Sequence, residues 1–180
     1  MNNDKVKWSY LAGIIDGEGT IAINTHNNPT KEFPNRVQTY ALEICIVNTD
    51  ERLMKWLIQH FGGQYYGRER ADKVNHRRAY AWRVTGHANR KRTLLALLPY
   101  LVMKREQAIL GLKYLDLHYS HSNDERRKLW EMSIKLNARG KETVTTNTRE
   151  AIEVEIAKIE SELHSDMQSG PVVIQVQNAA

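Results

Sequence analysis

The sequence has few of the residues on which several protein classes depend. A single cysteine among 180 residues, Cys45, excludes an internal disulfide framework and a cysteine-based zinc site. No apolar run approaches the roughly 18 residues that a membrane-spanning helix needs, and Met1–Asp4 lack the basic-then-apolar layout of a secretion signal. We therefore expect an intracellular protein in a reducing compartment, neither bound to a membrane nor secreted.

Basic residues are concentrated in one segment. The formal net charge of +5 is too small to decide on a polyanionic partner by itself. Residues 64–106, however, carry 11 Lys/Arg against 3 Asp/Glu, whereas residues 1–63 carry 6 against 7 and residues 107–180 carry 9 against 11. The whole positive excess therefore lies in the middle of the chain. Either a solvated charged face or a nucleic-acid surface explains such a cluster.

Hydrophobic periodicity and turn residues divide the chain into ten elements. Alternation in the segment 37–47 places Leu42, Ile44 and Ile46 on a core face and leaves the opposite face open. Because consecutive strands are typical of hairpins, we predict an α+β fold with a mainly antiparallel sheet. The helices are expected near residues 4–15, 49–61, 89–98, 104–119 and 123–137 and from residue 147, and the strands near residues 20–25, 37–47, 64–71 and 77–85.

Residues 10–21 form the most specific pattern in the chain. They read YLAGIIDGEGTI and lie between an apolar helix and an amphipathic strand. This segment resembles the signature of the LAGLIDADG homing endonucleases, whose common variant is LAGxxDGxG followed by a strand, and Glu18 supplies its second acid. The residues that match are Leu11, Ala12, Gly13, Asp16, Gly17 and Gly19.

The resemblance extends to the predicted order of elements. The core fold of that family is αββαββα with an antiparallel β-ribbon sheet, so the resemblance covers residues 4–150 and leaves additional C-terminal helices. It implies one endonuclease domain over residues 1–168, with residues 169–180 as a loose tail or an added strand. It also implies double-stranded DNA as the partner, and a location in the cytoplasm or an organelle matrix, where that DNA lies.

Small residues on the motif helix predict a close contact between helices. Ser9 and Gly13 lie four residues apart, an arrangement that packs either within one chain or between two chains. The resemblance implies the second, namely a homodimer in which the two Glu18 side chains lie close together. Since the chain carries one motif, the expected target is near-palindromic. The 180 residues of the chain suffice for only half of a protein that cuts two strands. The implied interface residues are Ser9, Ala12, Gly13 and Asp16.

Phosphodiester hydrolysis explains why the motif carries carboxylates. The reaction needs an oxygen-ligated divalent cation, normally Mg²⁺, for which Mn²⁺ or another divalent cation substitutes. The resemblance implies that Glu18 binds this metal directly, helped by the backbone carbonyl of Gly19. It further implies that Asn48 orients the attacking water, that Arg52 lies near the scissile phosphates and that Lys104 stabilises transition-state charge. Surface solvation is the alternative for Arg52 and Lys104.

The open face of the predicted sheet is the surface expected to read DNA. A strand of about ten residues spans about 33 Å, or about one turn of duplex, and two-stranded ribbons fit the major groove. Arginine pairs with guanine edges, asparagine with adenine and glutamate with the cytosine amino group. Solvent exposure is the alternative for each residue. The residues expected on bases are Asn24, His26, Asn28, Thr39, Glu43, Cys45, Tyr66, Arg68, Arg70, Arg77 and Arg83, and those expected on the phosphate backbone are Lys73, Arg78, Arg139 and Lys141.

These features together predict a site-specific DNA endonuclease of the homing type. We expect it to hydrolyse both strands of a long near-palindromic site with a divalent metal. The alternatives on the same fold are a maturase, which assists RNA splicing and binds intron RNA, and a non-catalytic DNA-binding protein. Relatives without nuclease activity tend to lose the acid of the motif, and Glu18 is intact here, which favours the enzyme.

Overall fold

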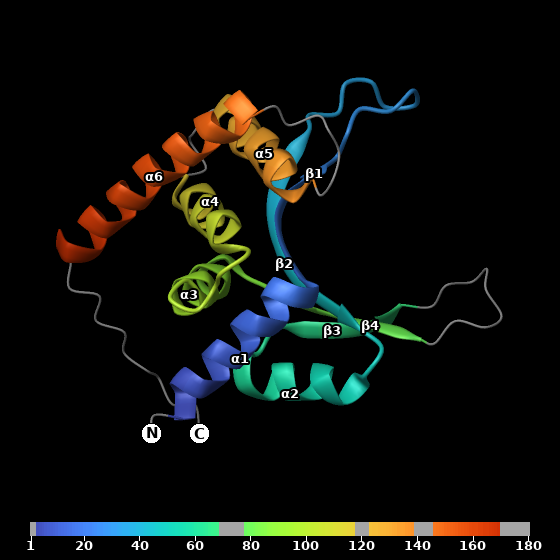
Figure 1. The fold of residues 1–180 in the computed structure, drawn as a ribbon. Helices are drawn as coiled ribbons and strands as arrows, with labels where there is room; N and C mark the ends of the chain where they lie inside the picture. The colour runs from blue at the N-terminus through green and yellow to red at the C-terminus, as the bar shows by residue number, and fades with distance from the viewer. Residues whose placement is uncertain (1–2, 69–77, 118–122, 139–145, 170–180) are drawn as a thin grey trace. The chain divides into compact units, whose positions relative to one another are not determined.

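The computed structural model describes residues 3–68, 78–117, 123–138 and 146–169. These residues belong to two compact units, Met1–Lys141 and Glu142–Ala180. The predicted order of helices and strands is confirmed (Figure 1). The first unit contains α1 (Asn3–Glu18), β1 (Gly19–His26), β2 (Thr39–Asn48), α2 (Glu51–Phe61), β3 (Gln64–Arg68), β4 (Ala79–Arg83), α3 (His87–Leu97), α4 (Arg105–Asp116) and α5 (Asn123–Asn137), and the second contains α6 (Thr146–Ser169).

The four strands form one antiparallel sheet in the order β1-β2-β4-β3. The β1–β2 hairpin is paired continuously from Gly19 and Ile46 at one end to His26 and Thr39 at the other. β2 also pairs with β4, and β4 pairs with β3, in each case antiparallel. The two predicted hairpins therefore join through β2 and β4. The predicted α+β class with an antiparallel sheet is confirmed.

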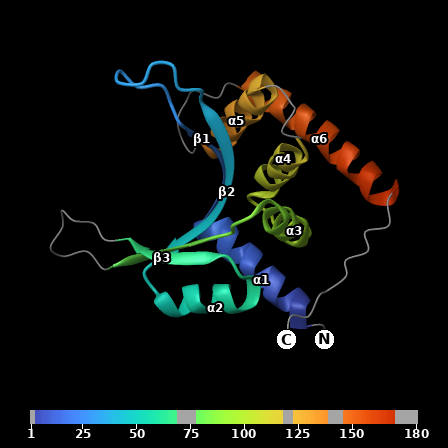
Figure 2. The same ribbon diagram turned by 180° about the vertical axis from the view of Figure 1, so that it is seen from behind.

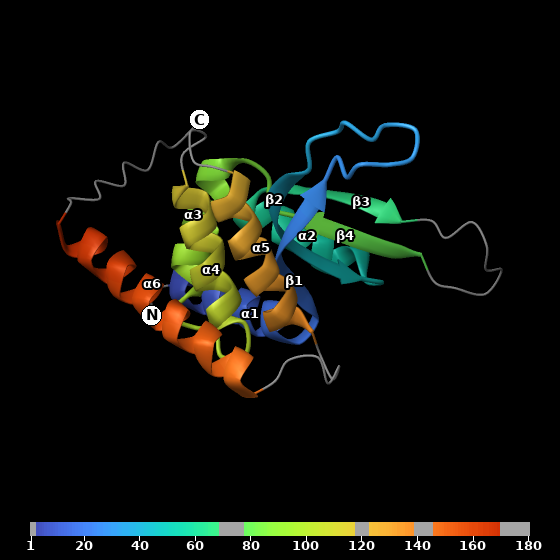
Figure 3. The same cartoon turned by 90° about the horizontal axis from the view of Figure 1, so that it is seen from above.

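Helices cover one face of the sheet. α1, α2, α4 and α5 pack against its strands, and Figures 1 and 3 show the helices of the first unit on the same side of the sheet. The predicted core residues Leu42, Ile44 and Ile46 are at most 2% exposed. Trp82 is fully buried on β4, and its indole Nε1 donates to the Gly62 carbonyl at 2.8 Å. Seen from behind, the opposite face carries no helix of the described part of this unit (Figure 2).

Side chains of α5 close the outer edge of β1. Ser133 Oγ accepts a hydrogen bond from the backbone N–H of Ile23 at 2.9 Å, and Asn137 Nδ2 donates to the carbonyl of Ile21 at 3.3 Å. Ser133 is only 2% exposed, so its hydroxyl satisfies a buried backbone donor that would otherwise destabilise the fold. α5 therefore fixes the strand that follows the motif.

Two helix ends bring the motif close to the end of β2. α1 continues through Gly17 to Glu18, beyond the end expected from the sequence, because one exposed glycine weakens a helix without stopping it. α2 begins after Asp50, whose side chain caps the helix, and ends at Gly62, whose φ of 68° lies in the region that favours glycine. Only Thr49 and Asp50 separate β2 from α2, so the catalytic candidates at the end of β2 are held by a short connection.

The second unit is described by α6. Its residues Ile152, Ile156 and Ile159 lie on one face at the helical spacing that the sequence predicts. Residues 170–180, which make up most of the expected tail, lie outside the described residues, and the single domain over residues 1–168 stays a prediction. Among the helices of the described residues, none is long and apolar enough to cross a membrane.

Candidate functional site

The motif carboxylate and the end of β2 meet in the structure. Glu18 is the last residue of α1 and is exposed, and Asn48 is the last residue of β2. The Asn48 Nδ2 donates a hydrogen bond to Glu18 Oε2 at 2.6 Å. Two residues that the sequence predicts in catalysis, 30 positions apart in the chain, are therefore in direct contact.

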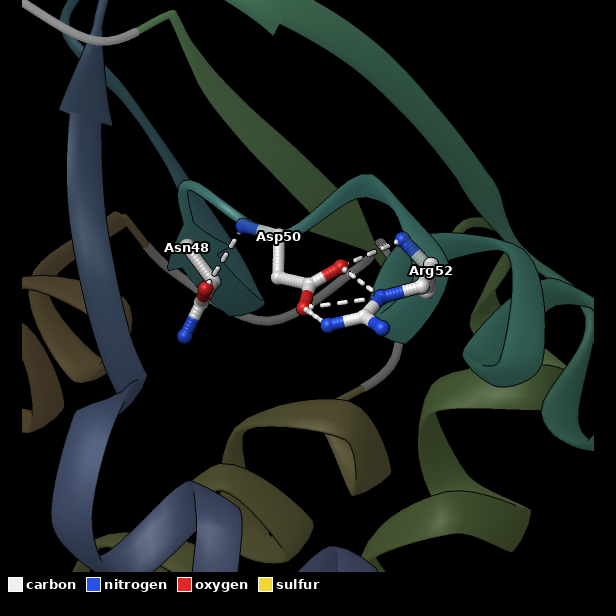
Figure 4. Close-up of polar contacts among 3 residues, drawn as sticks. All are labelled: Asn48, Asp50 and Arg52. Carbon is white, nitrogen blue, oxygen red and sulfur yellow. Dashed lines mark hydrogen bonds and ion pairs between the residues drawn. The ribbon is translucent and has the colours of Figure 1, made fainter.

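Asn48 also connects Glu18 to the start of α2. Its Oδ1 accepts the backbone N–H of Asp50 at 2.8 Å, and Asp50 in turn accepts the backbone N–H of Arg52 at 2.9 Å. The Arg52 guanidinium lies against the same carboxylate, with Nε 3.0 Å from Oδ1 and Nη2 2.5 Å from Oδ2. Figure 4 shows these contacts among Asn48, Asp50 and Arg52. Both ends of the Asn48 amide are engaged, which fixes its orientation toward Glu18.

The contact with Arg52 sets the protonation of Asp50. Hydrogen bonds from Arg52, together with its charge, lower the pKa of Asp50 from an ordinary 3.8 to about 2, and the pKa of Arg52 is raised in return. Because the folded-state pKa is depressed, the stabilisation from this pair is complete above about pH 4 and is lost as the pH falls through about 2.

We expect an NMR titration of the Asp50 carboxyl to give a midpoint of about 2, and R52A to return it toward 3.8. A midpoint that does not move in R52A would show that Arg52 is not the cause.

Lys104 and Asp16 form a buried connection between α1 and the start of α4. The Asp16 carboxylate accepts the backbone N–H groups of Val102 at 2.8 Å and Lys104 at 2.9 Å. The Lys104 ammonium donates to the carbonyls of Ile15 at 2.7 Å and Asp16 at 2.5 Å, and Lys104 is only 5% exposed. These contacts hold the end of α1, which carries Glu18. The direct transition-state role of Lys104 stays a prediction.

A hollow of about 550 Å³ lies over the outward face of α1. A Cβ atom added to Gly13 or Gly17 would meet nothing within 4 Å, so this face of the helix is open within one chain. The residues that line the hollow are Ser9, Tyr10, Gly13, Ile14, Gly17, Glu18, Asn48 and Leu53. The Glu18–Asn48 pair therefore borders the same hollow as the small residues Ser9, Gly13 and Gly17.

The residues predicted at a homodimer interface divide between two sides of α1. Ser9 and Gly13 are exposed, whereas Ala12 is fully buried and Asp16 is 9% exposed. Residues four apart share a helix face, so Ser9, Gly13 and Gly17 lie together, while Ala12 and Asp16 share another face that is buried within the chain. Ala12 and Asp16 are thus not available to a partner chain, which corrects that part of the prediction. Gly17 completes the outward face instead.

The described residues do not complete a metal site within one chain. The described part of the protein has no group of three or more His, Cys, Asp or Glu side chains that could hold a metal ion. Glu18 offers one exposed carboxylate, and Gly19 follows it at the start of β1. Mg²⁺ commonly takes one or two carboxylates together with water and substrate phosphates. The residues present therefore fit a site that needs oxygen ligands from a substrate or from a second chain.

A polar network occupies the open face of the sheet. Asn24 on β1 donates from Nδ2 to Glu43 Oε2 on β2 at 2.6 Å. Arg83 on β4 places Nη2 at 3.0 Å from Glu43 Oε1, and its guanidinium carbon lies 5.3 Å from the ring centre of Tyr66 on β3. Four residues from the predicted DNA-binding set, one on each strand, are therefore in contact with each other.

The other residues predicted to bind DNA are placed less uniformly. His26, Asn28 and Thr39 are exposed at the far end of the β1–β2 hairpin, and Arg78 is exposed just before β4. Cys45 is only 8% exposed, and its backbone is flanked on both sides by paired strands, with Thr20 of β1 and Arg83 of β4 opposite it. The expected base contact of Cys45 is therefore corrected. The side chain of Arg68 and the residues Arg70, Lys73, Arg77, Arg139 and Lys141 lie outside the described residues.

Sequence reasoning missed three residues at these surfaces. Asp50 orients Arg52 in addition to capping α2, and the spacing Asn48-x-Asp50-x-Arg52 is the signal that points to it. Gly17 belongs to the outward face of α1, which the four-residue spacing from Gly13 indicates. Gln64 lines a hollow of the open face. Its position near β2 depends on the pairing of β2 with β4, which joins the two predicted hairpins and which local sequence does not reveal.

Comparison with solved structures finds proteins of the same fold. The homing endonuclease I-CvuI in complex with its target is 22% identical with a TM-score of 0.60, over 88% of this chain and 97% of that chain. The archaeal intron-encoded homing endonuclease I-Vdi141I complexed with DNA is 17% identical with a TM-score of 0.59, over 88% and 99%. The group I intron-encoded homing endonuclease I-CeuI complexed with DNA is 16% identical with a TM-score of 0.53, over 79% and 70%.

The chain therefore has the fold of the LAGLIDADG homing endonucleases, and the resemblance predicted from the motif is confirmed at the level of the fold. No protein-family model matches the sequence, and comparison with curated proteins gives no match. The shared fold includes the motif helix, the end of β2 and the open face of the sheet. A shared fold does not by itself fix what these surfaces bind or catalyse, which depends on their own residues.

Proposed function

We propose that the chain is a site-specific endonuclease that binds double-stranded DNA as a homodimer and hydrolyses both strands with a divalent metal. The observation that carries this proposal is the exposed Glu18 carboxylate, held by Asn48 where the outward face of α1 meets the end of β2. An oxygen ligand in that place suits metal-assisted phosphodiester hydrolysis. The similar structures named above contain DNA, which supports duplex DNA as the substrate.

The residues of the chain supply positioning and charge for this reaction. Glu18 and the Gly19 carbonyl would hold Mg²⁺ or a substitute, which polarises the phosphate and activates a water molecule when it is bound. Asn48 holds the Glu18 carboxylate through its hydrogen bond of 2.6 Å. Arg52 is oriented by Asp50, yet its side chain is 91% exposed, so its guanidinium stays accessible to a phosphate oxygen. A fixed positive charge there stabilises the negative charge that develops during hydrolysis.

The homodimer is supported by the outward face of α1. A single chain offers one Glu18, whereas cutting two strands needs a carboxylate for each strand. Gly13 and Gly17 lack side chains, so a second helix could approach this face closely. A two-fold arrangement would bring the two Glu18 carboxylates near one another.

Alanine at Gly13 is expected to separate folding from association. The added Cβ meets nothing within 4 Å in one chain, and alanine favours a helix over glycine by up to about 1 kcal/mol. At concentrations low enough for both proteins to be monomeric, G13A should therefore unfold at an equal or higher temperature than the wild type. The same methyl group should raise the dimer dissociation constant at least about 10-fold, which corresponds to about 1.4 kcal/mol. Sedimentation equilibrium measures the association, with the exposed K55A as control. Association of G13A at the wild-type strength would exclude this face as the interface.

The proposed activity is tested on a randomised library of duplex DNA. Incubating the full chain with the library and Mg²⁺, then sequencing the cut ends, should recover a near-palindromic sequence cut on both strands. Chelation of the metal should stop the reaction. Cleavage of neither strand, combined with binding to a pool of structured RNA, would overturn the proposal and support the splicing alternative on the same fold.

A further inference from the structure

Glu43 lies in the middle of the open face and uses both of its carboxylate oxygens within the chain. Oε2 accepts a hydrogen bond from Asn24 Nδ2 at 2.6 Å, and Oε1 lies 3.0 Å from Arg83 Nη2. The Glu43 side chain is 25% exposed. A cytosine amino group would have to displace one of these partners and leave it unpaired, which is unfavourable. The residue type favours a cytosine contact, but in the structure the Glu43 carboxylate binds Asn24 and Arg83.

Arg83 is held from two sides and still reaches solvent. Besides its ion pair with Glu43, its guanidinium carbon lies 5.3 Å from the ring centre of Tyr66, which is within the range of a cation–π contact. Its Nε is buried and has no hydrogen-bond partner in the described structure, so contact with a ligand is left to the terminal nitrogens. The side chain nevertheless stays 42% exposed. A guanidinium that is fixed before binding loses less conformational freedom on binding.

The pair borders a hollow on the open face. This hollow measures about 270 Å³, and its lining contains two arginines, Arg83 and Arg90, against one glutamate. It lies where β2 extends past the end of β4, because β4 pairs with β2 only at Cys45 and the residues that follow it. The surface there is concave and carries more positive than negative side chains, which suits an acceptor-rich ligand such as the edge of a purine.

We propose that Asn24, Glu43 and Arg83 act as one unit in which Arg83 reads a guanine in the major groove and Glu43 is the positioning residue. The proposal rests on the DNA binding proposed above and adds a base preference to it. Guanine presents two acceptors, N7 and O6, to the major groove, and the terminal nitrogens of one arginine pair with both. Glu43 fixes the orientation of the Arg83 guanidinium, and Asn24 fixes the orientation of the Glu43 carboxylate. Each half of a near-palindromic target therefore contains one guanine that depends on all three residues.

The test compares base preferences among variants of the full chain. Duplexes with a randomised centre are bound to the wild type, E43Q, R83A and N24A, separated by gel shift and sequenced. Glutamine keeps the size of the side chain but has one acceptor oxygen for two donors, so E43Q releases Arg83 without leaving a cavity. We expect E43Q and R83A to lose the preference for guanine at the same position of each half-site, with the preferences at the other positions unchanged. N24A should show a weaker loss of the same preference.

Affinities for the wild-type consensus duplex give the second readout. R83A is expected to bind about 10- to 100-fold more weakly, and the E43Q/R83A double variant no more weakly than R83A, because Glu43 acts through Arg83. The matched control is E131Q, which removes a carboxylate that lies 3.1 Å from Arg127 on α5, and it should keep the wild-type consensus. Thermal unfolding of each variant verifies that it is folded.

Two outcomes would overturn the proposal. If E43Q lost a base preference at a different position from R83A, for example a preference for cytosine, Glu43 would contact a base independently of Arg83. Additive losses of affinity in the double variant would show that the two residues act separately. A wild-type chain that selects no duplex sequence would instead defeat the proposed function itself, and so the two failures are distinguishable.

Discussion

Replacing Glu18 with glutamine is expected to abolish DNA cleavage while leaving DNA binding intact or slightly tighter. The amide has nearly the same size as the carboxylate, so it does not crowd Asn48, but it removes the negative charge with which Glu18 would bind a divalent metal. We expect the single-turnover cleavage rate to fall at least about 1,000-fold. The exposed carboxylate repels the phosphate backbone in the absence of metal, so its loss should not weaken binding measured by gel shift.

The matched control is E125Q, which removes an exposed carboxylate from α5 and should cleave at the wild-type rate. Both variants should unfold at the wild-type temperature, since neither side chain is part of the buried core. If E18Q cleaves DNA as fast as the wild type, the catalytic assignment of Glu18 is wrong. If it loses binding together with cleavage, Glu18 contributes to the DNA-binding surface and not specifically to the chemistry.

Replacing Lys104 with methionine is expected to lower the free energy of unfolding by about 3 kcal/mol. The Lys104 ammonium donates to the carbonyls of Ile15 and Asp16 in a buried position. Hydrogen bonds to a charged group contribute about 1.5–3 kcal/mol each, and a buried acceptor without a partner is destabilising. Methionine matches the length of lysine but supplies no donor. Urea denaturation followed by circular dichroism measures the loss.

The control for this substitution is K91M. Lys91 also joins two helices, through its ion pair with Asp116, but the two side chains are 42% and 34% exposed. Such a partly exposed pair contributes less than about 1 kcal/mol, so K91M should unfold close to the wild type. If K104M is as stable as the wild type but has lost cleavage, the structural role argued from the carbonyl contacts is wrong, and a direct role of Lys104 in the transition state is supported.

The parts of the fold that could be predicted depend on local spacing. Alternation along β2 separates Leu42, Ile44 and Ile46 from the open face, because a strand repeats every two residues. The motif likewise places Glu18 between a helix and a strand, whatever the helix packs against. The resemblance implied an interface role for Ala12 and Asp16, but both are buried within the chain, and spacing tells which residues share a helix face but not which face the core covers.

The parts that could not be predicted depend on contacts between distant segments. Lys104 is a charged residue beside an apolar segment, and its burial follows only from the position of Asp16, 88 residues earlier in the chain. The network around Glu43 similarly requires β2 to pair with β4, which places Arg83 beside it. A list of residues on an open face therefore gives candidates for binding, whereas tertiary pairing decides which of them support one another.

The closure of the β1 edge has a consequence for how the sheet can grow. A strand with free backbone groups invites another strand, from the same protein or from a different one. Here the N–H of Ile23 and the carbonyl of Ile21 are already satisfied by Ser133 and Asn137. Strand addition on that side would have to break these hydrogen bonds first. α5 thus protects the β1 edge against edge-to-edge aggregation and keeps the width of the sheet constant.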